Sequence, residues 1–302
     1  MKQRLLSALE GIEQRAEGGK WRRLWAAPYR YLYAIGFREL AYRLSPKERM
    51  TRADTFFGQP MLVALPAGTD IYLLGAKSHG SEIRLARFMI HQLEDGDTFV
   101  DVGAHFGYFS MLAAALIGPE GRVKAIEAAR SNHAIAQRNL STLPQCQLLH
   151  RAANATGEAV QFHEFDALHS EYNSMHAEQF EGESWYQQQA HRQYSVPGLR
   201  LADLLQQLPH PPKLIKIDVE GAENEVIAGA QPFLQNHRST VVMEYLSAAR
   251  GNASHRAACA QLLDMGYQCH AIAPDGGLSA VAEPERHLRA HRMDSDNFVF
   301  LG

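Results

Sequence analysis

The segment FVDVGAHFG, residues 99–107, places an aspartate and two glycines directly after a short apolar run. Glycine lets backbone amides approach a ligand closely because it has no Cβ atom. Asp101 adds a carboxylate at the end of the predicted strand, which suits a cationic, amine-bearing ligand. A dinucleotide site favours G-x-G-x-x-G, whereas here three residues, among them His105, separate Gly103 from Gly107. The spacing therefore disfavours a pyrophosphate.

Glu127 ends the next predicted strand, RVKAIEA, about 20 residues past the glycines. A carboxylate in this position can accept both hydrogen bonds of a ribose diol. The residue therefore supports a nucleoside ligand and leaves NAD and S-adenosylmethionine both open.

A third group of acidic residues lies in IKIDVEGAENEVIAGA, residues 215–230. Asp218 and Glu220 follow a buried strand at the ligand-binding edge, where they could orient or deprotonate a hydroxyl group. Glu223 falls in the first turn of the next helix, where the helix dipole favours a carboxylate. Asp218, together with Glu244 at the end of VVMEYL, could also hold a hard divalent cation such as Mg²⁺.

The elements that position these residues alternate between strand and helix from residue 81 onward, which predicts a mostly parallel α/β sheet. The last two strands are joined by a loop, residues 274–296, without a clear helix, and we expect them to pair antiparallel. A polar stretch within residues 154–198 is too long for a routine connection. We interpret it as a substrate-side insertion in a domain that spans residues 80–302.

Two further regions precede this domain. Residues 1–54 are predicted to form a basic helical arm, and residues 55–79 a β-hairpin made from the β-prone runs at 60–66 and 69–75. We expect acceptor determinants in the arm, in the polar stretch from Tyr172 to Tyr194 and in the loop from Pro274 to Asn297.

Charge is distributed unevenly along the chain. The formal net charge is -3, but residues 1–52 carry 12 Lys/Arg and 5 Asp/Glu, a net +7. Arginines interleaved with aromatic residues in the arm are compatible with peripheral contact to an anionic membrane surface or glycolipid. A solvated helical face on the main domain is the alternative. The acidic remainder disfavours nucleic acid as a partner.

Three cysteines without metal-like spacing, no membrane-spanning apolar run and no secretory leader predict a cytoplasmic protein, which the arm could hold at the inner membrane face. The oligomeric state is left open.

The ordered segments resemble the FkbM family of S-adenosylmethionine-dependent methyltransferases over roughly residues 80 to 301. They are FVDVGAHFGYFSMLAA, the strand ending in Glu127, LRLADLL, IKIDVEGAENEVIAGA and VVMEYL. The resemblance implies a class I methyltransferase with a Rossmann-like seven-stranded sheet and an antiparallel last strand. It also implies S-adenosyl-L-methionine as cofactor and a hydroxyl acceptor, because members of assigned function methylate sugars or polyketides.

For single residues, the resemblance implies Asp218 and Glu220 near the transferred methyl group. His105 stands where the family usually has asparagine. The residues expected around the cofactor are Glu82, Asp101, Gly103, His105, Gly107, Glu127 and Glu223.

These observations predict an O-methyltransferase acting on a hydroxyl of a sugar or glycan, a glycolipid or a secondary metabolite. An NAD-linked oxidoreductase on a similar sheet and a non-catalytic nucleoside-binding protein are the alternatives.

Overall fold

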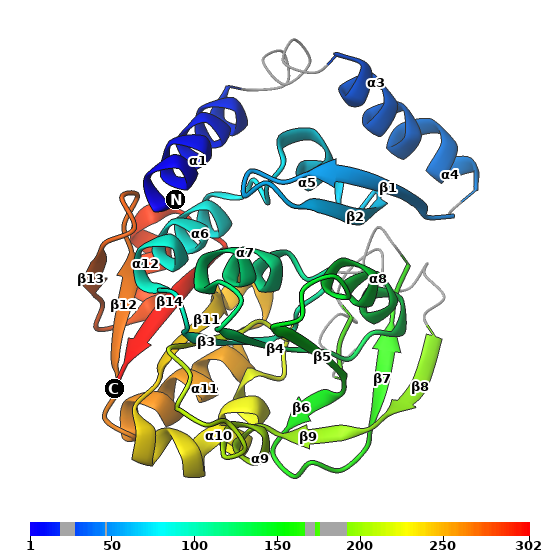
Figure 1. The fold of residues 1–302 in the computed structure, drawn as a ribbon. Coiled ribbons are helices and arrows are strands. Elements are labelled where there is room, and N and C mark those ends of the chain that lie inside the picture. The colour runs from blue at the N-terminus through cyan, green and yellow to red at the C-terminus, as the bar shows by residue number, and fades with distance from the viewer. Residues whose placement is uncertain (19–27, 46, 167–172, 176–191) are drawn as a thin grey trace.

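An eight-stranded sheet forms the centre of the fold (Figure 1). The structure, a computed structural model, describes residues 1–18, 28–45, 47–166, 173–175 and 192–302. In spatial order the strands are β13 (Leu278–Ala280), β12 (Gln268–Ile272), β14 (Ser295–Leu301), β11 (Thr240–Leu246), β10 (Leu214–Ile217), β3 (Thr98–Val102), β4 (Arg122–Glu127) and β5 (Cys146–His150).

The pairing confirms the predicted mostly parallel sheet. Strands β5, β4, β3, β10 and β11 run parallel, whereas β14 is antiparallel to both β11 and β12. The sheet has eight strands instead of the predicted seven because the three-residue strand β13 pairs with the edge of β12. The chain progresses from β3 towards β5 on one side and from β10 towards β11 on the other, so the carboxyl ends of β3 and β10 border the crevice where ligands bind in such sheets.

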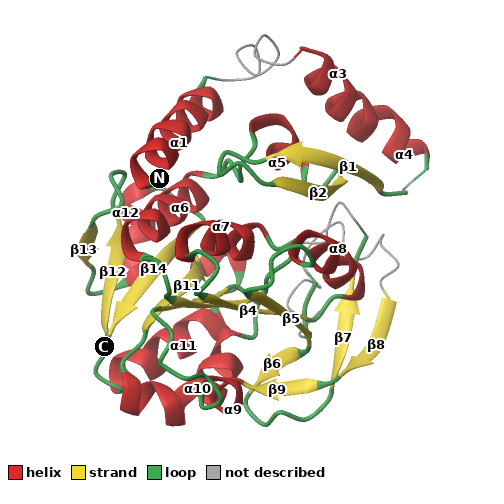
Figure 2. Cartoon of the chain, viewed as in Figure 1, coloured by secondary structure: helices red, strands yellow, loops and turns green. Residues whose placement is uncertain are grey.

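Helices cover both faces of the sheet (Figure 2). Alternate residues of β3 enter the two cores, since Phe99 and Val100 are both fully buried in different apolar clusters. One face carries α6 (Gly80–Gln92), α7 (Tyr108–Ile117) and α8 (Arg130–Leu140), and the other α9 (Leu201–Leu205), α10 (Glu223–His237) and α11 (Ala253–Asp264).

Two short elements near the end of the chain complete the domain. The short helix η5 (Ala248–Arg250) follows β11. Helix α12 (Pro284–His291) lies in the segment expected to be a plain loop, and that expectation is wrong. Within PERHLRAH, Leu288 is the one aliphatic side chain longer than alanine, so the helix leaves no apolar periodicity in the sequence.

The predicted hairpin is also wrong. Strand β2 (Pro60–Leu65) pairs with β1 (Arg49–Asp54), and the second β-prone run forms helix α5 (Thr69–Leu74). Helix α5 ends at Gly75, which takes the left-handed conformation that commonly ends helices. The proposed boundary at residues 54 and 55 therefore cuts through the real hairpin.

The described parts of the arm are helical up to β1. Helix α1 (Lys2–Glu17) buries Leu5, Leu9 and Ile12 in the core shared with α6. Helix α3 (Pro28–Gly36), a π-helical turn η1 (Phe37–Ala41) and α4 (Tyr42–Leu44) follow. No helix in the described ranges is long and apolar enough to cross a membrane.

The insertion forms two small strand pairs beside the main sheet. Strands β7 (Val160–Glu164) and β8 (Arg192–Val196) are antiparallel, and β6 (Ala152–Asn154) and β9 (Gly198–Arg200) are parallel. Most of the stretch predicted to bear acceptor determinants, including Tyr172, lies outside the described residues.

Candidate active site

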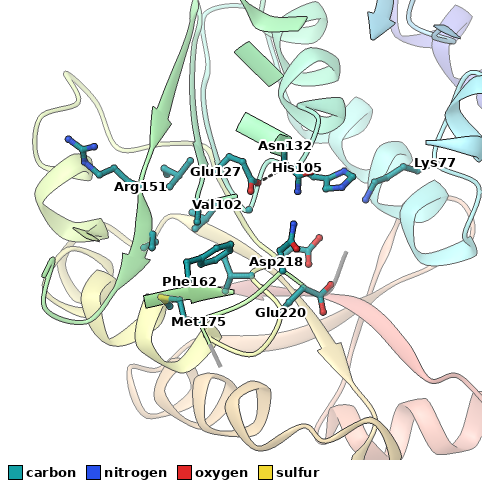
Figure 3. A pocket seen from close by; sticks show the side chains of 17 residues that line it. Lys77, Val102, His105, Glu127, Asn132, Arg151, Phe162, Met175, Asp218 and Glu220 are labelled. Carbon is teal, nitrogen blue, oxygen red and sulfur yellow. Dashed lines mark hydrogen bonds between the residues drawn. The ribbon is translucent and has the colours of Figure 1, made fainter. Parts of the chain in front are cut away.

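A cavity opens at the carboxyl ends of β3, β4 and β10 (Figure 3). The empty space in it is about 690 Å³ when the open solvent at its mouth is counted. In Figure 3, Glu127 and His105 lie on one side of it, and Asp218, Glu220 and Phe162 on the other.

The turn after β3 depends on residues that tolerate left-handed backbone conformations. Gly103 has φ +82°, and a Cβ atom there would lie 1.7 Å from the carbonyl oxygen of Asp218. His105 has φ +52°, in a region where His and Asn are several-fold enriched among non-glycine residues. Histidine in place of asparagine therefore keeps the turn. Gly107 faces Leu140 of α8 and does not line the cavity, contrary to its predicted cofactor contact.

His105 is poorly suited to act as a base. Burial, assisted by the positive charge of Lys77, lowers the pKa of its imidazole to about 3. The ring stacks on Phe106 at a centroid distance of 3.8 Å. A neutral, stacked ring contributes shape and polarity to the wall of the cavity, while the backbone N–H of His105 donates a hydrogen bond to Glu127.

Glu127 lies where the sequence predicted. Its Oε2 accepts the N–H of His105 at 2.7 Å, and its Oε1 accepts the N–H of Ala129 at 2.8 Å. Burial raises its pKa to about 7, against the opposing effect of these two hydrogen bonds. Both oxygens are thus held in place on the cavity wall, an arrangement that fits binding of a ribose diol.

Asp101 does not line this cavity. Successive strand side chains point to opposite faces, and Val102 faces the cavity while Asp101 is fully buried. Its Oδ2 accepts the hydroxyl of Ser110 at 2.6 Å, and its Oδ1 lies 3.6 Å from Nζ of Lys216. Asp101 therefore pairs with Lys216 and lies outside the lining of the cavity, where its contact with the cofactor was predicted.

Lys216, which was not singled out from the sequence, lies beside Asp218. Its side chain is 3% exposed, and its Nζ lies 3.1 Å from Oδ2 of Asp218. Burial by itself raises the pKa of Asp218, but Lys216 and Lys77 lower it further than burial raises it, and the net pKa is below the ordinary value. Asp218 is therefore an ionised carboxylate at the cavity wall.

Asp218 belongs to a cluster of three carboxyl groups. One oxygen from each of Asp218, Glu220 and Glu244 lies within 4.8 Å of the other two. Burial, reinforced by the charge of Asp218, raises the pKa of Glu244 to about 8. Carboxylate oxygens are the ligands that hard divalent cations prefer. However, Lys216 and a proton on Glu244 already balance much of the negative charge of the cluster.

Glu223 lies behind the carboxyl cluster and outside the cavity lining, so the structure differs from its predicted cofactor contact. Its Oε1 accepts the N–H groups of Val219 and Gly221 at 3.3 and 3.2 Å. Its Oε2 lies 3.4 Å from Nε2 of His255, and both side chains are 1% exposed. Glu223 therefore fixes the turn that carries Asp218.

A second, more polar cavity adjoins the first and shares Lys77, His105 and Glu220 with it. Glu82 lines this second cavity and not the first, contrary to its predicted contact with the cofactor's amino group. Its Oε1 lies 3.0 Å from Nζ of Lys77. Asp70, His79, Glu244, Arg250 and Ser295 also line the second cavity.

Other residues of the first cavity were not singled out from the sequence. Asn132 is buried on α8, and Arg151 and Ala152 follow the third parallel strand, where the strand-end rule could have found them. Phe162 and Asn173 come from the insertion. The insertion was predicted to lie on the substrate side of the site, and its sequence offers no signal for these two residues.

Comparison with known proteins gives one family match. Residues 101–269, more than half of the chain, match the family described as "Methyltransferase FkbM domain". No curated protein matches the sequence.

Solved structures with a similar fold include three methyltransferases. A methyltransferase FkbM from Methylobacillus flagellatus KT is 15% identical, with 75% of this chain and 56% of that chain covered and a TM-score of 0.41. An O-methyltransferase from Bacillus cereus in complex with SAH is 14% identical, with 72% and 80% covered and a TM-score of 0.39. A precorrin-6y C5,15-methyltransferase from Geobacter metallireducens GS-15 is 14% identical, with 73% and 87% covered and a TM-score of 0.39.

The sheet order, the site at the strand ends and the family match together define a class I methyltransferase that depends on S-adenosylmethionine. The chain belongs to the FkbM methyltransferase family. This assignment decides against the NAD-linked oxidoreductase.

Proposed function

We propose that this protein transfers a methyl group to a hydroxyl oxygen of a polar acceptor, namely a sugar or glycan, a glycolipid or a secondary metabolite. The observation that carries the proposal is the junction of the two cavities. One is a nucleoside-type site at the strand ends with Glu127 on its wall, and the other is lined by carboxyl groups and cations suited to hydroxyl groups.

The residues present fit S-adenosylmethionine in the first cavity. Glu127 holds two acceptor oxygens for the ribose, and Gly103, which lines the cavity, allows the turn after β3 to lie against the backbone of Asp218. When bound there, the cofactor supplies a methyl group already activated by its sulfonium centre. The protein must then align the acceptor oxygen, exclude water and take up the hydroxyl proton.

Asp218 is the first candidate for handling the acceptor hydroxyl. Its carboxylate is ionised and held by Lys216, so it can accept the hydrogen bond of a hydroxyl at the junction. A protonated Glu244 can donate a hydrogen bond from the other side of the cluster. Glu220, which lines both cavities, is the second candidate for proton acceptance.

The proposal is tested by incubating the purified protein with radiolabelled S-adenosylmethionine and a panel of sugars, glycolipids and hydroxylated secondary metabolites. Methyl ethers are the expected product; they resist base and release the label as a methyl halide only under ether-cleaving conditions such as hydriodic acid. Calorimetry with S-adenosylhomocysteine distinguishes a protein that does not bind the cofactor from one that binds it but does not methylate hydroxyl groups. Binding without transfer to any hydroxyl, together with transfer to a nitrogen or carbon acceptor, would reject O-methylation and leave the methyltransferase class intact.

A divalent cation on the carboxyl cluster is a second candidate feature, favoured by the convergence of Asp218, Glu220 and Glu244. A cation there would lower the pKa of an acceptor hydroxyl. Activity that disappears with a chelator and returns with Mg²⁺ would support it, and full activity of chelator-treated enzyme would reject it.

A further inference from the structure

The arm exposes apolar side chains that line neither of the two cavities. Tyr29, Leu32, Leu40 and Leu44 are 88%, 63%, 68% and 88% exposed. Tyr29 and Leu32 lie three residues apart on α3, a step that keeps side chains on one face of an α-helix, and Leu40 and Leu44 follow on η1 and α4. We call these four residues the arm stripe.

The opposite side of the arm is attached to the rest of the protein. Arg30 lies 3.3 Å from Asp54 of β1, and its guanidinium lies 5.6 Å from the ring centroid of Tyr72 on α5. Tyr33 contacts Tyr72 at 6.1 Å between ring centroids, and Arg49 lies 5.0 Å from the ring centroid of Tyr33. Figure 1 shows α3 and α4 on the far side of β1, β2 and α5 from the central sheet. The stripe therefore does not contribute to the core.

The segment that carries the stripe is basic. Residues 28–52 contain six Lys/Arg and two Asp/Glu, a net +4, although the whole chain carries -3. Arg38, Lys47 and Arg52 are exposed. An exposed apolar face with flanking cations and tyrosines is the pattern of helices that lie in the interface of a lipid bilayer.

We propose that the arm stripe and its flanking basic residues dock on an anionic lipid surface. Charge complementarity favours this occupant, because a membrane leaflet that contains anionic lipids has a negative surface potential and attracts segments rich in Lys and Arg. A second copy of the chain would bring two surfaces of net positive charge together, which is unfavourable. The inference concerns a surface outside both cavities and does not depend on the identity of the methyl acceptor.

The test uses the full-length protein and vesicles of phosphatidylcholine, alone or mixed with phosphatidylglycerol. We expect flotation with the anionic vesicles only, and release at high salt because ions screen the basic residues. The double variant Leu32→Ser/Leu40→Ser should bind about tenfold more weakly. The matched control is Leu263→Ser, which alters a leucine that is 40% exposed on α11.

A charge variant tests the other half of the proposal. Lys47→Glu/Arg52→Glu should also weaken binding about tenfold or more, whereas Arg289→Glu, at a side chain that is 80% exposed on α12, should not. Circular dichroism and thermal unfolding establish that each variant is folded.

No flotation of the wild type, or equal losses for Leu263→Ser and the stripe variant, would overturn the proposal. A dimer in light scattering that the stripe variant dissociates, without vesicle binding, would overturn it in favour of self-association.

Discussion

The two adjoining cavities share a wall, but they are built in different ways. The first lies over consecutive strand ends, and its carboxylate, Glu127, is held by two backbone N–H groups. The second is assembled from segments far apart in the chain, and its acidic residues are compensated by side chains such as Lys77. Backbone N–H groups therefore position the acidic residue of the cavity that we assign to the cofactor, while side chains compensate those of the cavity that we assign to the acceptor.

Two carboxyl groups near the junction of the cavities also differ in protonation state. Lys216 keeps the pKa of Asp218 low, whereas burial raises that of Glu244 to about 8. Two neighbouring acids with pKa values pushed apart can accept and donate hydrogen bonds at the same time. We therefore expect variants in the cofactor cavity to change the affinity for S-adenosylhomocysteine, and variants of the residues that handle the acceptor to change kcat.

The largest expected effect is that of Asp218→Asn. The amide cannot accept the hydroxyl proton, so kcat should fall by about 10²- to 10⁴-fold, while calorimetry should find the affinity for S-adenosylhomocysteine changed only a few-fold. Asp203→Asn, at a carboxylate paired with Arg200 at 3.2 Å on the surface, is the control. Asp218 lines the first cavity, so a fall in cofactor affinity in step with kcat would mean that it serves cofactor binding and does not handle the acceptor hydroxyl.

Gly103→Ala should damage the cofactor side by destabilising the turn. The new Cβ atom would meet the carbonyl oxygen of Asp218 at 1.7 Å, in addition to the strain of φ +82°. We expect a loss of about 3 kcal/mol in the free energy of unfolding in urea. The control is Gly96→Ala, which has φ +84° and no neighbouring atom within 4 Å. Equal losses for the two variants would show that strain alone matters and that the close approach does not.

The sequence predicts the position of a residue well where local structure determines it, and poorly where tertiary packing does. Gly103 and Glu127 line the cavity, as the sequence predicted, because a strand, a turn and a helix in succession determine their places. Asp101 and Gly107 do not line it, since pleat direction and the contact with α8 turn them away. Lys77 reaches the site only through the packing of α5 and α6, which no local pattern encodes.

Segment 69–74 shows the same limit for secondary structure. Its residues, TDIYLL, are β-prone, but the nearby strand β2 pairs with β1, and the segment forms helix α5. Tertiary context overrides a weak local preference over so short a run.

The protonation state of Glu244 predicts a pH dependence of stability. Its pKa is raised from 4.5 to about 8 in the folded protein, so the stabilisation is fully present below about pH 4.5 and is lost as the pH rises through 8. Between about pH 6 and pH 9 the free energy of unfolding should fall by about 1–3 kcal/mol. Glu244→Gln should reduce that fall, leaving the smaller part due to Glu127, whereas a change at the exposed Glu120 should not. An unchanged pH profile in Glu244→Gln would mean that Glu244 is ionised at neutral pH.

The smallest effect is expected for Glu82→Gln, and it tests the assignment of Glu82 to the acceptor side. Glu82 lines the second cavity beside Lys77, so the affinity for S-adenosylhomocysteine should stay within about twofold of the wild type. Glu127→Gln, on the cofactor side, should weaken it about tenfold or more because a charged hydrogen-bond acceptor is lost. Glu94→Gln is the matched control, since Glu94 also pairs with a lysine, Lys2, at 2.6 Å, but on the surface. A loss of cofactor affinity in Glu82→Gln as large as in Glu127→Gln would move Glu82 to the cofactor side and show that the two cavities act as one site.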